Sequence, residues 1–454
     1  MKTSSYKVDY YARHLMNVNK YNKVIAKENI LNADGILLLK KGASFYPEVV
    51  EKILNFDLVK PLDESILISR PLTGMKVYQH INHVIKRYSF VEKMHYFANV
   101  NLVLKHQCAA LGRYPLLIQK MTVQKILQPN EFDKSVMCGW LALGLAKQMK
   151  LSAKQIHAVF LAALTHDVGM LHINPVILQR QGEISASEWK IVQSHVELSK
   201  KVLDRVENLD SLVKRAVLEH HERCDGMGYP AGKIGNELCL EGQIVAMCDA
   251  IIALSVKGLE LKKKAFVNVI PFLQLNSEAH FYCTYETLIK WLRNVGYTER
   301  RCIPDEEIET LLDGVFYEEF FLKQWHEVIN YMVDGIPQTS RDRKLLAVIT
   351  AKKQLDSILL GSGLVDIGYI KWMHQVKEDK LQSAYHEVEH AYLMLKEVRW
   401  ELRHITRTLR LIYKNTGDLD AALVQRLSIG FKKLNMLNAS YSNTNAKQRS
   451  DILH

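Results

Sequence analysis

Two adjacent histidines and two carboxylates stand together in the stretch His220-His221-Glu222-Arg223-Cys224-Asp225-Gly226-Met227-Gly228-Tyr229-Pro230. Imidazole nitrogens and carboxylate oxygens are ligands of divalent transition metals. The two glycines permit positive φ angles and a close approach of the backbone to a ligand. Pro230 fixes its own φ and favours an extended Tyr229. The stretch has the chemistry of a metal site beside a shaped loop, and a polar helix end followed by a turn is the ordinary alternative.

Groups of the same chemistry occur at three further places, which are the pair His166-Asp167, His195 and Asp249. The pair His166-Asp167 directly follows a long apolar run, and Asp249 stands alone between apolar residues. A carboxylate in such surroundings costs free energy unless it is paired or bound to a metal. We therefore group these residues into one candidate site for Fe, Mn or Zn. Its members are His166, Asp167, His195, His220, His221 and Asp249.

Helices are the elements predicted to position this site. Apolar spacing predicts helices over 136–149, 152–165, 209–222 and 243–254. Ser152 is a suitable N-cap for the second of these helices. Ser185 and Glu188 form a capping box that opens a further helix, which presents His195 and runs to about residue 206. The six candidate ligands thus come from successive helices of a mainly α protein.

The flanking segments are predicted to play other roles. Residues 22–70 contain an Asp-Gly turn between two apolar runs, which predicts a hairpin in a small β-containing module. Apolar residues from Leu381 to Ile412 follow an a/d heptad spacing, ended by Asn415-Thr416-Gly417. This seam fits a self-folded antiparallel hairpin and a homodimeric coiled coil equally well.

Five segments follow from these patterns. They are a regulatory N-terminal module over 1–74, a helical connector over 75–129, a metal-binding core over 130–260, a helical extension over 261–369 and a coiled-coil-like hairpin over 370–454.

Composition limits the kinds of partner. The chain has 454 residues, 48% hydrophobic and 24% charged, with a net charge of +11, so an anionic ligand such as a nucleotide is plausible. The positive charge is scattered, which argues against a nucleic-acid surface. Seven scattered cysteines without a Cys-x-x-Cys pair favour a reducing compartment. We expect a cytoplasmic protein, because no signal-peptide core and no run of about 18 apolar residues is present.

The whole pattern resembles the HD-GYP family of bacterial phosphodiesterases, which degrade the signalling molecule cyclic di-GMP. The resemblance covers about residues 130–256. The sequence HHERCDGMGYP at 220–230 matches the family's HHExxDGxGYP throughout. THDVG at 165–169 supplies the HD pair, His195 matches the next ligand, and CDAIIAL at 248–254 supplies the last Asp. The N-terminal DGILLLKKG hairpin is similar to a small segment that precedes this domain in some members.

The resemblance implies an HD-type helical domain that binds two divalent metals, Fe or Mn, through the six residues grouped above. It implies that Asp167 bridges the metals and forms the catalytic pair with His166. It further implies that the loop residues Gly226, Gly228, Tyr229 and Pro230 shape the substrate pocket and contact a signalling-protein partner. In-line displacement at phosphorus is the expected chemistry, with both metals stabilising phosphate oxygens.

The chain departs from the family at the HD pair and upstream of it. Met170 replaces the lysine of HDxGK, which contacts the phosphate. Lys134 stands where the family has a histidine ligand, and Asn130 where it often has a glutamate. A lysine ammonium there would weaken metal binding, so no third metal is expected. Asp133 or Glu131 is a candidate substitute ligand.

A further departure lies after the last Asp. The arginine-rich segment usual in the family is missing, and Lys257 or Lys262 to Lys264 are the candidate phosphate contacts. Three functions stay open. They are a cyclic di-GMP phosphodiesterase, a catalytically impaired domain that acts as a cyclic di-GMP sensor or protein-interaction module, and another phosphohydrolase of the HD superfamily.

Overall fold

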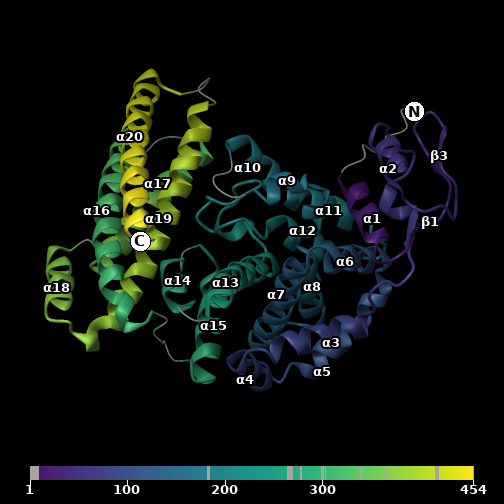
Figure 1. The fold of residues 1–454 in the computed structure, drawn as a ribbon, viewed down its shortest axis with the longest axis horizontal. Helices are drawn as coiled ribbons and strands as arrows, with labels where there is room; N and C mark the ends of the chain where they lie inside the picture. Colours follow the sequence, from purple (N-terminus) through teal and green to yellow (C-terminus); the bar gives the residue numbers. More distant parts are fainter. Residues whose placement is uncertain are drawn as a thin grey trace. The chain divides into compact units, whose positions relative to one another are not determined.

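The chain is mainly α-helical and divides into two compact units (Figure 1). The first unit comprises residues 1–221, 238–265 and 286–297, and the second comprises 222–237, 266–285 and 298–454. The computed structural model describes residues 10–452 apart from gaps at 181–184, 263–268, 277–278, 298–300, 302, 338–339, 341, 365 and 415–418. The predicted fold class is confirmed. The five predicted segment boundaries stay predictions.

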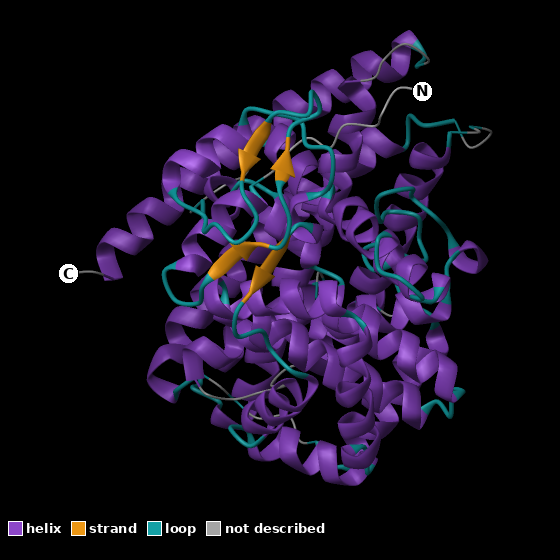
Figure 2. Ribbon diagram, turned by 90° about the vertical axis from the view of Figure 1, so that its right-hand side faces the viewer, coloured by secondary structure: helices purple, strands orange, loops and turns teal. Residues whose placement is uncertain are grey.

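The first unit begins with the small β-containing module. Two antiparallel strand pairs form there, β1 (Val24–Ala26) with β4 (Ile66–Ile68) and β2 (Ile30–Leu31) with β3 (Leu37–Leu39) (Figure 2). The second pair is the predicted hairpin, and Gly35 has a φ of +81° in its turn. The first of the two predicted apolar runs does not form a single strand. The chain turns after Ala26, so that β1 pairs with β4 and only β2 belongs to the hairpin.

Helices α1 (Tyr11–Asn19) and α2 (Pro47–Leu54) complete this module. Its buried core also includes Val123 and Leu171, which lie far along the chain. Leu171 belongs to η3 (Val168–His172), the short 3-10 helix that follows the His-Asp pair. The N-terminal module therefore packs directly against the element that follows two of the candidate ligands.

The remaining helices of the first unit form the all-helical core. Gly139 and Gly144 let α7 approach its neighbours, since an added Cβ would lie 2.8 Å from the Leu164 side chain and 2.3 Å from that of Trp291. The bounds are α3 (Gly74–Ile85), α4 (Ser89–Ala98), α5 (Asn101–Ala110), α6 (Pro115–Leu127), α7 (Pro129–Gln148), α8 (Ala153–Thr165), α9 (Pro175–Leu178), α10 (Ala186–Gln193), α11 (His195–Asp204), α12 (Ser211–Glu219) and α13 (Leu240–Lys262).

The capping predictions in this core are confirmed. Ser152 caps α8 in a capping box with Gln155, and Ser185 caps α10 in a capping box with Glu188. The helix predicted from residue 185 to about 206 is interrupted at Ser194, whose side chain hydroxyl donates to the Ile191 carbonyl at 2.6 Å. His195 consequently stands at the first position of α11.

The second unit is a helical assembly with its own core. Its helices are α14 (Val269–Leu275), α16 (Ile308–Val333), α17 (Arg343–Ser362), α18 (Ile367–Glu378), α19 (Tyr385–Lys414) and α20 (Ala421–Ile452). The loop Glu222–Glu237, here called the GYP loop, belongs to this unit and inserts Met227 into its core. Helix α15 (Tyr282–Asn294) begins in the second unit and ends in the first.

The predicted heptad seam is buried inside this second unit. Its residues from Val388 to Ile412 lie in one core with side chains of α16, α17 and α20. Leu381 and Ala384 precede the helix, because Lys380 adopts a left-handed conformation with a φ of +49° and ends the preceding segment. The predicted stop at Asn415-Thr416-Gly417 lies outside the described residues. The chain's own helices thus cover the seam, and pairing of two chains stays a prediction.

Among the residues that the structure describes, no helix is both long enough and apolar enough to cross a lipid bilayer.

Candidate metal centre

The six predicted ligands lie at the ends of helices or inside one helix of the first unit. His166 caps the C-terminus of α8, Asp167 opens η3, and His195 starts α11. His220 caps the C-terminus of α12 and His221 follows it, while Asp249 lies within α13. Helices α8 and α12 both have their C-termini at the site. The C-terminus is the negative end of the helix dipole, so both helices favour a bound cation there.

Backbone carbonyls orient three of the histidines in the same way. The Nδ1–H groups of His166, His195 and His220 donate to carbonyls three residues earlier, at 2.8, 2.7 and 2.6 Å. A neutral imidazole that donates through Nδ1 presents a lone pair at Nε2. This bond fixes the tautomer and the ring direction, as second-shell partners do in metal sites.

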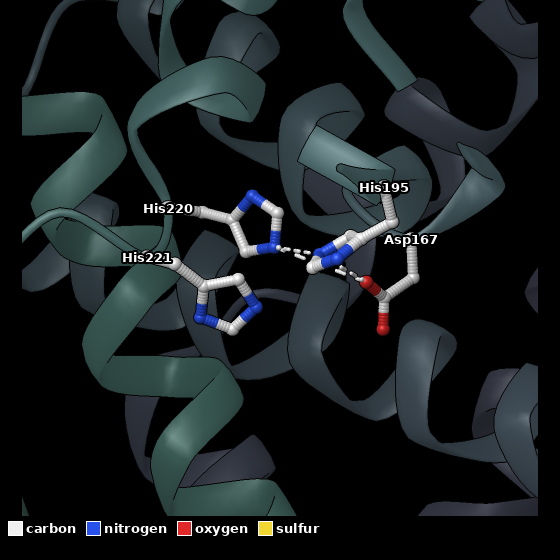
Figure 3. Close-up of side chains that lie close together, drawn as sticks. All are labelled: Asp167, His195, His220 and His221. Atoms are coloured by element: carbon white, nitrogen blue, oxygen red, sulfur yellow. Dashed lines mark hydrogen bonds and ion pairs between the residues drawn. The ribbon is translucent and has the colours of Figure 1, made fainter. Parts of the chain in front are cut away.

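The Nε2 atoms converge on the Asp167 carboxylate (Figure 3). Oδ1 lies 3.2 Å from His195 Nε2 and 3.8 Å from His220 Nε2, and these two nitrogens are 3.3 Å apart. His221 packs beside them, with ring centroids 4.1 Å from His220 and 5.0 Å from His195. One ligand atom from each of Asp167, His195, His220 and His221 lies within 4.8 Å of the others.

His166 and Asp249 extend this cluster on the other side of Asp167. His166 Nε2 lies 3.3 Å from Asp167 Oδ2 and 3.4 Å from Asp249 Oδ1. The two oxygens of Asp167 therefore face different histidines. The structure brings together all six residues that the sequence grouped.

Burial and charge set the protonation states of the cluster. Burial lowers the pKa of His221 to about 4 and holds that of His220 well below its usual value, and neighbouring histidines add to both effects. Burial disfavours the charged forms of His166 and Asp167, yet their mutual attraction raises the pKa of His166 and lowers that of Asp167. Neutral His220 and His221 and ionised Asp167 are thus in the forms that bind metals, whereas His166 has to give up a proton when it binds one.

The residues fit a cation. Asp167 Oδ1 is buried and accepts no hydrogen bond of good geometry from the part of the chain that the structure describes. Lone pairs of two imidazoles and one carboxylate point at the same small volume, which is unfavourable until a cation occupies it. Nitrogen and oxygen donors in this mixture suit Fe, Mn or Zn.

Gly169 and Ser199 hold the site together and were not singled out as site residues by the sequence. A Cβ on Gly169 would lie 2.2 Å from the His195 carbonyl oxygen and 2.6 Å from the Ser199 nitrogen. The Ser199 hydroxyl donates to the His166 carbonyl at 2.6 Å and accepts from the Gly169 N–H at 2.8 Å. The glycine two residues after the aspartate was the available signal, since only glycine permits this approach of η3 to α11.

A buried group of charges supports η3 from the other end. Lys120 Nζ lies 2.7 Å from Asp63 and 2.9 Å from His172 Nε2, the last residue of η3. Arg205 donates to both oxygens of Asp63 at 2.9 and 2.7 Å. The Tyr11 ring packs on Lys120 at 3.3 Å and stacks on His172. These contacts connect the N-terminal module to the segment that follows the His-Asp pair.

The residues that depart from the family pattern are placed as follows. Met170 lies within η3 and is partly exposed. The carboxylate of Glu131 pairs with Lys134 at 2.8 Å. Asp133 pairs with His80 at 2.6 Å and with Arg87 at 3.2 Å. The two acidic residues considered as substitute ligands are therefore engaged elsewhere, so the structure gives no support to that hypothesis.

The predicted substrate-contacting residues of the GYP loop belong to the second unit. Gly226 has the expected positive φ, +81°, whereas Gly228 does not, and the Tyr229–Pro230 peptide is cis. The Glu222 carboxylate accepts from the Ala231 N–H at 2.6 Å and from the Lys233 N–H at 3.0 Å. The side chains of Lys257 and of Lys262 to Lys264, the predicted phosphate contacts, lie outside the described residues.

Comparison with known proteins gives a consistent answer. The family model described as HD domain matches residues 115–281. 3'3'-cGAMP-specific phosphodiesterase 1 of Vibrio cholerae serotype O1 is 36% identical over 167 residues, covering 33% of this chain and 38% of that protein. A cyclic di-GMP phosphodiesterase of Pseudomonas aeruginosa is 29% identical over 147 residues, covering 32% of this chain and 36% of that protein.

3'3'-cGAMP-specific phosphodiesterase 3 of Vibrio cholerae is similar over a shorter stretch. It is 34% identical over 113 residues, covering 25% of this chain and 24% of that protein. The chain thus spans between 24% and 38% of the length of these relatives. The matched family segment contains the His-Asp pair, the converging histidines and the complete HHERCDGMGYP motif. Residues 115–281 are therefore an HD domain of the HD-GYP family.

Proposed function

We propose that the chain is a metal-dependent phosphodiesterase that hydrolyses cyclic di-GMP in bacterial second-messenger signalling. The observation that carries this proposal is the convergence of His195 Nε2, His220 Nε2 and Asp167 Oδ1 on one small volume. The names of the relatives supply the substrate class, because they are phosphodiesterases of cyclic di-GMP or of 3'3'-cGAMP.

Two divalent cations, Fe or Mn, would supply Lewis-acid stabilisation of the charge that develops on the phosphate. His195, His220 and His221 would hold one cation, and His166 and Asp249 would hold the other. Asp167 is the proposed bridge, because Oδ1 faces His195 and His220 while Oδ2 faces His166.

The protein's own groups do the remaining work in this proposal. Carbonyl bonds at Nδ1 keep His166, His195 and His220 oriented without rearrangement, which is the preorganisation that lowers a barrier. His166 and Asp167 are the proposed catalytic pair, because His166 Nε2 lies 3.3 Å from Asp167 Oδ2. Gly226, Gly228, Tyr229, Pro230 and Lys257 are the proposed substrate contacts.

Met170 favours a second candidate function. The family's lysine at this position contacts the phosphate, and a thioether offers no charge to a phosphate oxygen. A chain that keeps its ligands and lacks this lysine would bind cyclic di-GMP and act as a sensor without turnover. Both candidates bind metal, but only the phosphodiesterase hydrolyses cyclic di-GMP.

Hydrolysis of cyclic di-GMP tests the proposal. The protein is purified without air, loaded with Fe or Mn, and compared with a His220→Ala/His221→Ala variant, with 3'3'-cGAMP as a second substrate. Turnover that disappears in the variant is the expected result. Saturable binding without turnover would establish the sensor instead, and less than one metal per chain would contradict both.

A further inference from the structure

Helix α19 makes direct contacts with the GYP loop, although 178 residues separate Arg223 from Glu401. Arg223 Nη2 lies 2.7 Å from Asp225 Oδ2 within the loop and 2.9 Å from Glu401 Oε1 on α19. The three side chains are nearly closed to solvent, with 14%, 0% and 11% exposed. A guanidinium in such a place needs carboxylate partners, and α19 supplies one of the two.

Two more residues of α19 complete the contact. Trp400 packs its ring against the Arg223 guanidinium, 5.4 Å from the ring centroid, and stacks on His404 with planes 9° apart. His404 Nε2 lies 2.7 Å from the Met227 carbonyl oxygen, so this nitrogen donates the hydrogen bond. Met227 itself is 4% exposed and belongs to the core of the second unit.

The turn at Gly226, between the residues that α19 contacts, is tightly packed. A Cβ on Gly226 would lie 2.6 Å from the Ile234 side chain and 3.3 Å from Ala347 of α17. The Asp225 carboxylate accepts from the Met227 N–H at 2.9 Å while it holds Arg223. Arg223 and the Met227 carbonyl, both contacted by α19, therefore lie on either side of the Asp225-Gly226 turn.

We propose that α19 is a built-in partner of the GYP loop, and that Glu401 and His404 are positioning residues for the substrate contacts at Tyr229 and Pro230. The C-terminal helices then hold the loop in one shape, and a separate protein does not use the Arg223–Met227 face. The link to substrate rests on the proposed function. The positioning of the loop by α19 does not.

The test uses the full chain with Glu401→Gln and His404→Ala, singly and together. Glu387→Gln is the matched control, because Glu387 is an exposed residue of the same helix. Hydrogen exchange of the peptide spanning 224–235 reports loop order, since the amides of Gly226, Met227 and Gly235 are bonded within the loop. We expect exchange in the double variant at least about 10-fold faster than in the control, with unchanged metal content.

Kinetics give the second readout. If the chain hydrolyses cyclic di-GMP, the double variant should show a KM raised about 10-fold with kcat reduced less, because substrate contacts and not the metal ligands are displaced. Loop exchange equal to that of Glu387→Gln overturns the proposal whatever the activity. Faster loop exchange without any turnover in the unchanged protein would uphold the positioning by α19 and refute only the proposed function.

Discussion

Replacing Asp63 with Asn should destabilise the first unit strongly. The Lys120 side chain is 0% exposed, and Asp63, which is 3% exposed, is its carboxylate partner at 2.7 Å. The Asn variant leaves the ammonium with His172 and the face of the Tyr11 ring. An uncompensated buried charge costs about 3–5 kcal/mol. At about 2 °C per kcal/mol for a unit of this size, the melting temperature should fall by roughly 6–10 °C.

A double-mutant cycle tests the cause of this loss. Lys120→Met should cost less, because Arg205 still holds both oxygens of Asp63. The variant Asp63→Asn/Lys120→Met should be more stable than Asp63→Asn by about 1–3 kcal/mol, since no buried ammonium remains. Thermal unfolding followed by circular dichroism measures each variant.

Glu28→Gln is the control for this cycle. Glu28 forms an exposed ion pair with Lys60 at 2.8 Å in the same module, and such pairs contribute about 0–1 kcal/mol. The reasoning is refuted if Asp63→Asn loses no more stability than Glu28→Gln. It is equally refuted if removal of Lys120 does not restore stability to the Asp63 variant.

Three further outcomes are expected. The pKa of Asp63 is lowered to about 2, because Lys120 and Arg205 outweigh the effect of burial. A depressed carboxyl pKa stabilises the fold above the ordinary value of 3.8, so the stability difference between the protein and Asp63→Asn should persist down to about pH 4 and shrink between about pH 4 and pH 2 in urea titrations. Gly169→Ala should lose bound metal by elemental analysis while Gly112→Ala, where an added Cβ meets nothing within 4 Å, retains it; equal metal content would contradict the role given to the close approach of η3. Chelation should lower the free energy of unfolding of metal-loaded protein by about 2.7 kcal/mol if the metal was held at 100 times its Kd, and calorimetry showing no change would argue against a resident cation.

The candidate ligands were predictable from the sequence because Asp167 and Asp249 stand in apolar runs where a carboxylate needs a partner, and because the histidines match a family motif. The groups that orient these residues were not predictable from the sequence. Ser199 is an ordinary helical serine in the sequence, and its role depends on η3 packing against α11. Asp63 and Arg205 are 142 residues apart, and no local pattern relates them.

The C-terminal heptad seam shows that the prediction of the fold was limited in the same way. A heptad pattern from Val388 to Ile412 establishes that one face of a helix is buried, and that face is buried. The pattern does not specify the partner, which proves to be mainly α16 and α17 of the same chain. The function of Glu401, Trp400 and His404 toward the GYP loop has no signature in the heptad at all.

The long separation of Arg223 from Glu401 has a consequence for the order of events during synthesis. A ribosome adds about 5–20 residues per second, so the 178 residues from Cys224 to Glu401 take roughly 10–35 s. During that interval the GYP loop exists without its helical partner, while His220 and His221 have already been made. Maturation of the loop therefore has to wait until α19 has been made, and release of a chain that stops before α19 would leave the loop without Glu401 and His404.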